Sequence, residues 1–325
     1  MLDIHSIIST ILWTSLTMKS KEPPIQVTGL YRYAVKGLSG DALSTVSLGG
    51  AGETFPDDRR YALLYEENLN KFNGKDWLHK ENFLCAFTDP VLMSSFQSCY
   101  ETNVLQGDGT TERLLQIKDR GTGEIIFKST NLAAKEGREQ LGHFLSERSG
   151  KTVVCVTADD FGGTDQDMPH RFQFGNTSSG YKKNKGDTRT VHIVNQRTVD
   201  AVSDAIGIPL DPRRFRPNIV IDGPPPFAEF DWVEKNHQQS LLTADGQGSF
   251  RPLSRTVRCR GISIDPDDTQ NGQIELDIPG LLAKHFPQHG PYLGIYACVD
   301  KAPCSVTVGD ELKLSSVTAP NVKLD

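Results

Sequence analysis

Hydrophobic and polar residues alternate along several short stretches of the chain. Between residues 25 and 35 every second position is apolar or glycine, which is the period of a β-strand with one buried face. The positions are Ile25, Val27, Gly29, Tyr31, Tyr33 and Val35. Runs of similar character predict further strands at residues 60–65, 152–157, 218–222, 262–265, 292–299 and 306–314.

Helical spacing is rarer. Asn131 stands where an N-cap would start a helix over residues 131–146. An apolar stripe over residues 199–206 predicts a second helix, which Gly207 would end. Asp277, followed two positions later by proline, predicts the start of a third and shorter helix.

Strands dominate this pattern, and helices do not alternate with them in the regular way of a doubly wound sheet. We therefore expect an α+β fold, mainly β, with a β-barrel or mixed architecture. The length of 325 residues is enough for two medium-sized domains. We expect a leader or disordered extension over residues 1–23, one domain over residues 24–150 and a second over residues 151–320.

A long polar stretch lies inside the second expected domain. Residues 162–185 are rich in Gly, Ser, Asp, Asn and Lys, and contain no periodic apolar pattern. Such a composition predicts a long loop, and loops of this length are often functional lids or linkers. We expect this loop to shape access to a site.

Charge and cysteine usage limit the class of protein. The net charge of −6 argues against a general nucleic-acid binder, which would carry a basic surplus. The six cysteines form neither a CxxC pair nor a zinc-type spacing, and six in a chain this long do not form a disulfide framework. They indicate a reducing compartment, so we expect an intracellular protein, cytoplasmic or mitochondrial.

The sequence does not determine the role of the N-terminal segment. Residues 4–16 are mostly apolar, and Lys19 and Lys21 follow. The run is shorter than the roughly 20 residues that span a bilayer, and no basic region precedes it. An unused extension and a weak targeting or anchoring segment are both compatible with it, so membrane association stays undecided.

Arginines are concentrated in two places. One cluster occupies residues 213–216 and the other residues 251–260. In an acidic chain such clusters indicate an anion site, because guanidinium groups pair bidentately with phosphate and carboxylate. Surface ion pairs with nearby Asp and Glu residues are the alternative, and composition alone does not decide between them.

Cys259 lies inside the second arginine cluster. A thiolate is a good ligand for a soft metal, and neighbouring cations favour it. A single cysteine is more often a small buried apolar residue. In an extended strand, Arg258 and Arg260 would point away from Cys259, whereas Arg255 would share its face.

Six short motifs carry a family resemblance. The sequence RCRGISIDP at residues 258–266 resembles the cysteine-to-Asp-Pro segment of MOSC (molybdenum cofactor sulfurase C-terminal) proteins, and RFRPNIVI at residues 214–221 resembles their FRPN strand. The others are YAVKG at residues 33–37, DDRRY at 57–61, GDT at 186–188, and GIY at 294–296 with VGD at 308–310. They occur in family order over nearly the whole chain, and resemble in particular those of the mitochondrial amidoxime-reducing component and its bacterial counterparts.

The resemblance implies a fold and a reaction. It implies an N-terminal MOSC β-barrel domain packed against the MOSC domain, with a molybdenum cofactor (Mo-molybdopterin) between them. It also implies an oxidoreductase that removes oxygen from small N-hydroxylated substrates at molybdenum. Since the chain contains no haem, flavin or iron–sulfur motif, the electrons would come from a separate donor of cytochrome b5 or ferredoxin type. A cofactor carrier or sulfur-relay module without reductase activity is the alternative.

Site residues carry over from the matching motifs. The resemblance implies that Cys259 ligates molybdenum and that Asp187 lies beside the metal, so these two are the candidate catalytic residues. The candidate cofactor-binding residues are Lys36, Arg59, Thr188, Arg216, Asn218 and Tyr296. Lys and Arg would neutralise the cofactor phosphate, while Asn and Thr would donate and accept neutral hydrogen bonds.

Some positions depart from the family pattern. The family's Lys-Ser pair is Lys36-Gly37 here, Arg189 stands where a serine follows the threonine, and Thr256 replaces a cysteine three residues before Cys259. These changes affect the substrate pocket more than cofactor binding. No residues in this chain support a pyridoxal phosphate site, although the family takes its name from an enzyme that contains one.

Overall fold

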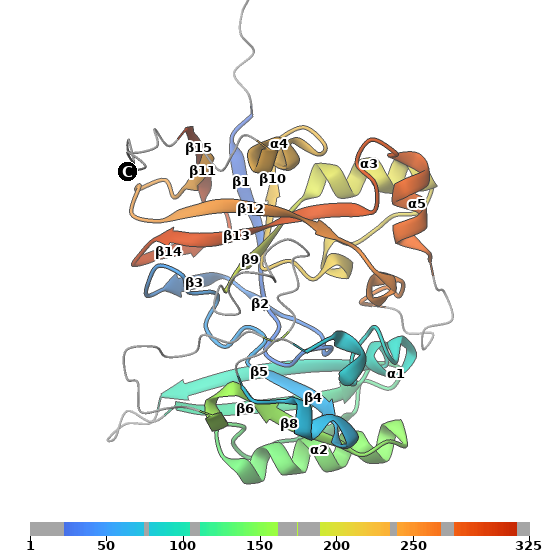
Figure 1. Ribbon diagram of the computed structural model, residues 1–325. Helices are drawn as coiled ribbons and strands as arrows, with labels where there is room; N and C mark the ends of the chain where they lie inside the picture. Colours follow the sequence, from blue (N-terminus) through green and yellow to red (C-terminus); the bar gives the residue numbers. More distant parts are fainter. Residues whose placement is uncertain are drawn as a thin grey trace, which may run out of the picture.

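The computed structural model describes residues 23–74, 78–104, 111–161, 174, 189–234, 239–267 and 276–316. Two units are visible in Figure 1: a barrel in the upper half and a smaller set of strands with one long helix in the lower half. The mainly β, α+β class expected from the sequence is confirmed. No helix within the described ranges is both long and apolar enough to cross a bilayer.

Seven strands close into a barrel in the upper unit. In order around the barrel they are β10 (Ile219–Asp222), β9 (Val191–Asn195), β13 (Tyr292–Lys301), β12 (Ser249–Val257), β11 (Gln239–Leu242), β15 (Glu311–Ser316) and β1 (Ile25–Arg32). The barrel closes because β1 pairs antiparallel with β10, and only the pair of β9 and β10 is parallel. Closure leaves none of the seven without a partner on either side, which removes the exposed edges of an open sheet.

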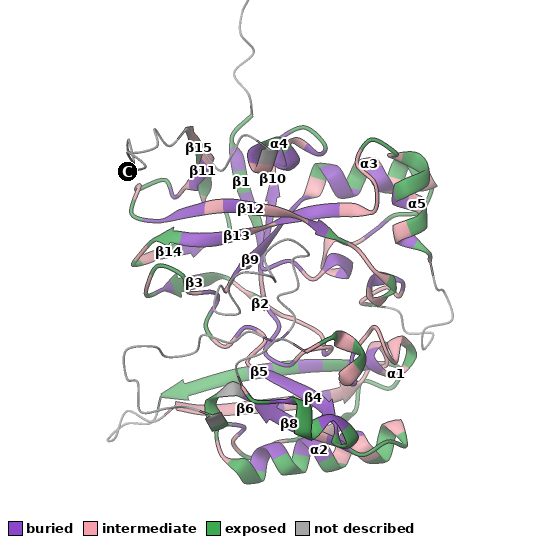
Figure 2. Cartoon of the chain, in the orientation of Figure 1, coloured by how far each residue is buried: buried purple, intermediate pink, exposed green. Residues whose placement is uncertain are grey.

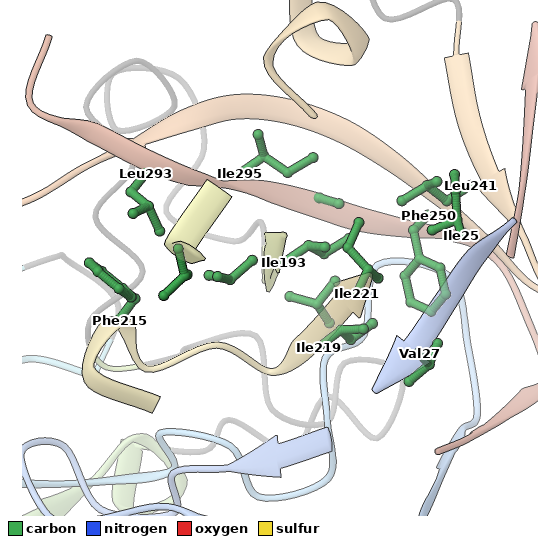
Figure 3. Packing of buried hydrophobic residues seen from close by; sticks show 14 of the residues in the cluster. Ile25, Val27, Ile193, Phe215, Ile219, Ile221, Leu241, Phe250, Leu293 and Ile295 are labelled. Carbon is green, nitrogen blue, oxygen red and sulfur yellow. The ribbon is translucent and has the colours of Figure 1, made fainter. Parts of the chain in front are cut away.

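Alternating side chains of these strands fill the barrel interior. Val27, Ile193, Ile221, Phe250 and Ile295 converge there and are almost completely buried (Figure 3). The burial colours show the same division in Figure 2, where the barrel strands are largely buried and the helices around them are exposed on one side. The alternation expected for β1 holds for Ile25 and Val27, but after a register shift between Val27 and Gly29 it is Leu30 that enters this core, and Tyr31 is partly exposed.

The lower unit has its own core and two smaller sheets. The first pairs β4 (Tyr61–Tyr65) with β8 (Val153–Thr157), and the second is a meander of β5 (Phe96–Val104), β6 (Thr111–Asp119) and β7 (Ile125–Lys128). Helix α2 (Lys135–Ser149) packs against β8, and α1 (Pro90–Ser94) precedes β5.

Strand pairing does not divide at residue 150. The strand β2 (Asp41–Leu43) pairs with the barrel strand β1, and β3 (Thr45–Leu48) pairs with β14 (Cys304–Thr307). The strand β8, which follows residue 150, pairs with β4 in the lower unit. The chain thus starts in the upper unit, builds the lower one and returns; the domain limits expected above stay a prediction.

Most elements expected from the sequence are present. Helix α3 (Gln196–Ile206) ends at Gly207, which has a φ of 71°, and α5 (Ile278–His285) begins at Asp277, whose side chain accepts a hydrogen bond from the Gly280 N–H. The helix expected from Asn131 begins only at Lys135. Asn131 instead accepts hydrogen bonds from the Arg113 and Ala133 N–H groups and fixes the preceding turn to β6.

One expected strand is wrong. Residues 262–265 lie in and after a 3-10 turn, Arg260–Ile262, because the N–H of Ile262 turns back to the carbonyl of Cys259. Most of the loop expected over residues 162–185 falls outside the described residues, apart from Phe174.

Helix α4 (Ala228–Glu234) carries an acid into the barrel core. Glu229 has no exposed surface, and its carboxylate accepts hydrogen bonds from Asn195 Nδ2 at 3.1 Å and from Thr198 Oγ1 at 2.9 Å. Burial raises the pKa of Glu229 to about 7 despite these donors. The group therefore becomes charged near neutral pH inside the fold.

We predict that Glu229 makes the protein less stable as pH rises. Its pKa rises from 4.5 to about 7 on folding. Below pH 4.5 the carboxyl is protonated in both states, whereas between pH 4.5 and 7 only the unfolded chain ionises. The free energy of unfolding should therefore fall by about 3 kcal/mol across that window and then level off. Urea unfolding of the wild type and Glu229→Gln at pH 5, 6, 7 and 8 checks this.

The difference in the free energy of unfolding between the wild type and Glu229→Gln tests this prediction. Asp231→Asn on the same helix is the control, because Asp231 is exposed. A wild-type minus Glu229→Gln difference that stays flat from pH 5 to 7.5 would contradict the prediction.

Candidate functional site

An open cavity lies between the two units. Its walls combine residues from the start of the chain with residues from β9, β13 and the segments before β10 and after β12. They are Lys36, Gly37, Arg59, Lys80, Cys85, Ala86, Phe87, Phe174, His192, Phe215, Arg216, Arg258, Cys259, Gly261, Ile262 and Tyr296.

Five of the residues expected from the sequence meet in this cavity. Lys36, Arg59, Arg216, Cys259 and Tyr296 all line it, although they are spread over most of the chain. Such convergence of scattered residues on one concave surface is typical of a ligand site.

The other three expected residues are not placed in the cavity wall. Asp187 and Thr188 lie outside the described residues. Asn218 is completely buried and holds three strands together: its Oδ1 accepts from the His192 N–H at 3.0 Å, and its Nδ2 donates to the Tyr31 carbonyl at 3.2 Å. Asn218 therefore has a structural role here, and its contact with a cofactor stays a prediction.

The two expected arginines sit on strained backbone. Arg59 has a φ of 51° and Arg216 a φ of 55°, and only Asp57 and Phe227 share this property among the described residues other than glycine. Left-handed backbone is unfavourable for a residue with a Cβ, and such residues gather at functional sites. Here the turns direct both guanidinium groups toward the cavity.

The carbonyl of Arg216 joins three cavity residues. It accepts a hydrogen bond from Arg59 Nη2 at 3.2 Å and lies 3.2 Å from His192 Nδ1. Burial, and then the nearby charge of Arg258, lower the pKa of His192 well below its usual range, so the ring is neutral. Because a carbonyl only accepts, Nδ1 carries the proton. The ring centroids of Tyr296 and His192 lie 5.2 Å apart.

Positive charge accumulates in the cavity, and only part of it is matched by carboxylates. Burial lowers the pKa of Lys36 and of Arg258, and lowers that of Arg216 to about 10. Burial also disfavours the charge on Arg59, but its pKa is raised because the Asp58 carboxylate pairs with it. The described lining residues include no Asp or Glu. An anionic ligand would relieve this unfavourable charge.

Neighbouring side chains keep these cations in place. Arg59 and Arg216 lie over the buried ring of Tyr33 at 5.2 and 4.3 Å, and Arg216 Nη1 donates to the Leu38 carbonyl at 2.7 Å. Arg258 Nη2 donates to the Phe215 carbonyl at 2.9 Å, while its buried Nε has no partner within the described part of the chain. A ligand acceptor at that nitrogen would satisfy it.

Cys259 follows the end of β12 and does not belong to the strand. Since β12 ends at Val257 and a 3-10 turn begins at Arg260, the alternation expected for Cys259 and its neighbours is wrong. Arg258 and Cys259 both line the cavity, and the thiol of Cys259 is half-buried and free. A second free thiol, Cys85, lines the same cavity but is almost completely buried.

Sequence analysis missed several cavity residues. Arg258 was visible in an arginine cluster, but its direction depended on the end of β12. His192, Lys80, Cys85 and Phe87 stand in ordinary strand or loop sequence, so nothing in the local pattern indicates their place in the cavity. Within the residues described, no three His, Cys, Asp or Glu side chains form a metal site. A molybdenum centre with one cysteine would take its other ligands from the cofactor.

We predict that Lys36→Met stabilises the cofactor-free protein. Lys36 is a half-buried ammonium whose pKa is lowered by burial, so removing its charge should raise the free energy of unfolding by about 1 kcal/mol. Inorganic phosphate should raise the Tm of the wild type more than that of the variant. Urea and thermal unfolding measure both effects.

Lys128→Met is the matched control for this change, because Lys128 is exposed at the end of β7. Its stability should stay within about 0.5 kcal/mol of the wild type. A Lys36→Met protein that is less stable than the wild type would show that the Lys36 charge does not destabilise the fold.

Comparison with known proteins identifies part of the chain. No curated protein sequence matches it. The crystal structure of the YuaD protein of Bacillus subtilis matches at 12% identity over 92% of this chain and 99% of that chain, with a TM-score of 0.39. The family model for the MOSC domain matches residues 180–313, which include Arg216, Cys259 and Tyr296. The chain therefore contains a MOSC domain, a type of domain linked to molybdenum-cofactor binding.

Proposed function

We propose that the cavity binds a molybdenum cofactor and that the protein is a molybdenum-dependent oxidoreductase. The observation that carries the proposal is the group of cations beside a free cysteine in a cavity whose described lining residues include no Asp or Glu. A cofactor with a phosphate and a soft metal requires both kinds of group: guanidinium and ammonium for the phosphate, and a thiolate for the metal.

Each cavity residue has a part in this proposal. Cys259 would supply the thiolate to molybdenum, and Arg258 lies next to it in the cavity wall. Lys36, Arg59 and Arg216 neutralise the phosphate. Tyr296 contacts the pterin from β13.

Three further roles rest on the motifs. Asp187 would lie beside the metal as the second catalytic residue, Thr188 would contact the cofactor, and Asn218 would hold the strands on which that contact is built.

The reaction we propose is removal of oxygen from a small N-hydroxylated substrate. The bound cofactor would supply the two-electron chemistry, and the protein would supply the thiolate, the fixed charges and the orientation. Phe87, Phe215 and Ile262 make part of the cavity wall apolar, which excludes water from the bound ligand. The electrons would come from a separate donor of cytochrome b5 or ferredoxin type.

We predict that Cys259→Ser loses or alters bound metal, whereas Cys85→Ser does not. Both cysteines line the cavity, so the pair of variants separates a ligand from a mere neighbour. The proteins are produced in a host that makes the cofactor, and molybdenum and pterin are measured per chain. Near-stoichiometric molybdenum and pterin are expected in the wild type and in Cys85→Ser. A wild type that copurifies with neither would overturn the cofactor proposal.

We also predict turnover of benzamidoxime by the loaded wild type with reduced methyl viologen as electron donor. The product, benzamidine, is measured by chromatography, and Cys259→Ser should lower kcat by at least about 100-fold because the metal loses its thiolate. A loaded protein that reduces no N-hydroxylated substrate would favour the carrier or sulfur-relay alternative.

A further inference from the structure

We propose that Arg214 is the positioning residue that holds the Cys259 segment against the segment of Arg216. The proposal rests on the function proposed above, because it takes Cys259 as the ligand to be positioned. The contacts themselves do not depend on that function.

Arg214 makes three contacts with the turn that follows Cys259. Its Nη1 donates to the carbonyls of Ile262 at 3.2 Å and Ser263 at 2.7 Å, and its Nη2 pairs with Asp265 Oδ2 at 2.9 Å. Only 3% of the Arg214 side chain is exposed. A buried guanidinium with this many fixed acceptors defines one geometry, since its planar fork must satisfy all of them at once.

Another hydrogen bond joins the same two segments, with its donor on the Cys259 segment and its acceptor on the Arg216 segment. Arg258, which precedes Cys259, donates from Nη2 to the Phe215 carbonyl at 2.9 Å. Contacts on both sides of Cys259 therefore run to residues 214 and 215, immediately before Arg216. The relative position of the thiol and the Arg216 guanidinium is set by these contacts.

A second layer connects the same turn to the lower unit. Asp267 pairs with Arg213 and, at 3.4 Å, with Arg120 Nη1, which follows β6. Arg213, Arg214 and Arg120 line a hollow beside the cavity, but each is engaged with carboxylates of the chain. We therefore assign these arginines to holding the turn and not to binding a further anion.

Two of the backbone hydrogen bonds in the turn after Cys259 are local, from Ile262 N to the Cys259 carbonyl and from Ser263 N to the Arg260 carbonyl. A third joins the turn to a later segment, from Leu276 N to the Ser263 carbonyl at 3.1 Å. Short turns of this kind open easily when the contacts that hold them are removed. Loss of Arg214 should therefore release Cys259 while the barrel core stays folded.

The test is the alkylation rate of individual cysteines in the cofactor-free protein. Wild type and Arg214→Met react with iodoacetamide at pH 7.5, and mass spectrometry of peptides reports each cysteine separately. Cys259 should react about tenfold faster in Arg214→Met, because local opening exposes it. Cys85 in the same cavity and Cys155 in the lower core should change by less than about twofold. Arg214→Lys, which keeps the charge, should restore part of the protection.

Arg138 supplies a matched control. Its Nη1 donates to the carbonyls of Leu132 and Ala133 at 3.0 and 2.9 Å, and its Nη2 pairs with Asp160, so it repeats the contacts of Arg214 in the lower unit. Arg138→Met removes the same number of buried contacts away from the cavity. It should leave the Cys259 rate unchanged.

An unchanged rate or a general loosening of the fold would overturn the proposal. The first would be an unchanged Cys259 rate in Arg214→Met. The second would be a parallel rise for Cys85, Cys155 and Cys259 in Arg214→Met, or a Cys259 rise in Arg138→Met, since either would mean general loosening of the fold. Molybdenum and pterin analysis of the wild type tests the cofactor itself, so failure of that assignment is seen separately.

Discussion

The pairing of β1 with β10 is the interaction on which the rest of the structure depends. It closes the barrel, and it brings together two segments that are far apart in the sequence: the segment after β1, which carries Lys36, and the segment before β10, which carries Arg216. The hydrogen bond from Arg216 Nη1 to the Leu38 carbonyl spans 178 residues. Asn218 secures the same place from its buried position, and that gives a structural reason for an asparagine in the RFRPN sequence.

The site contains strained backbone and buried cations, and both destabilise the protein unless the rest of the fold compensates. Arg59 and Arg216 adopt left-handed backbone, and three cations have pKa values lowered by burial. Neither feature helps the empty protein to fold. Both direct donors and positive charge to one place, which a bound anion would use without further rearrangement. The closed barrel beneath, with its continuous core, is the rigid support that holds them there.

Sequence patterns predicted the elements better than the details of the site. The strands β1, β10 and β13 and helices α3 and α5 follow from periodicity and capping, because those signals are local, whereas the barrel strands β9, β11 and β12 were not predicted. The end of β12 does not, since it is set by contacts of Arg258 with Pro291 and Phe215 from distant segments. His192 and Cys85 were missed for the same reason: their place in the cavity comes from tertiary packing. The motifs, in contrast, identified five cavity residues through a family resemblance that periodicity alone does not contain.

The arginine clusters show why composition left two interpretations open. The two interpretations apply to different members of the first cluster. Arg216 and Arg258 line the cavity, whereas Arg213 and Arg214 are engaged with Asp211, Asp265 and Asp267. Adjacent residues in a tight turn point in different directions, so Arg214 reaches into the protein while Arg216, two positions later, reaches the cavity. In this cluster Arg216 faces the cavity that we propose as the anion site, and Arg213 and Arg214 hold in place the backbone from which Arg216 extends.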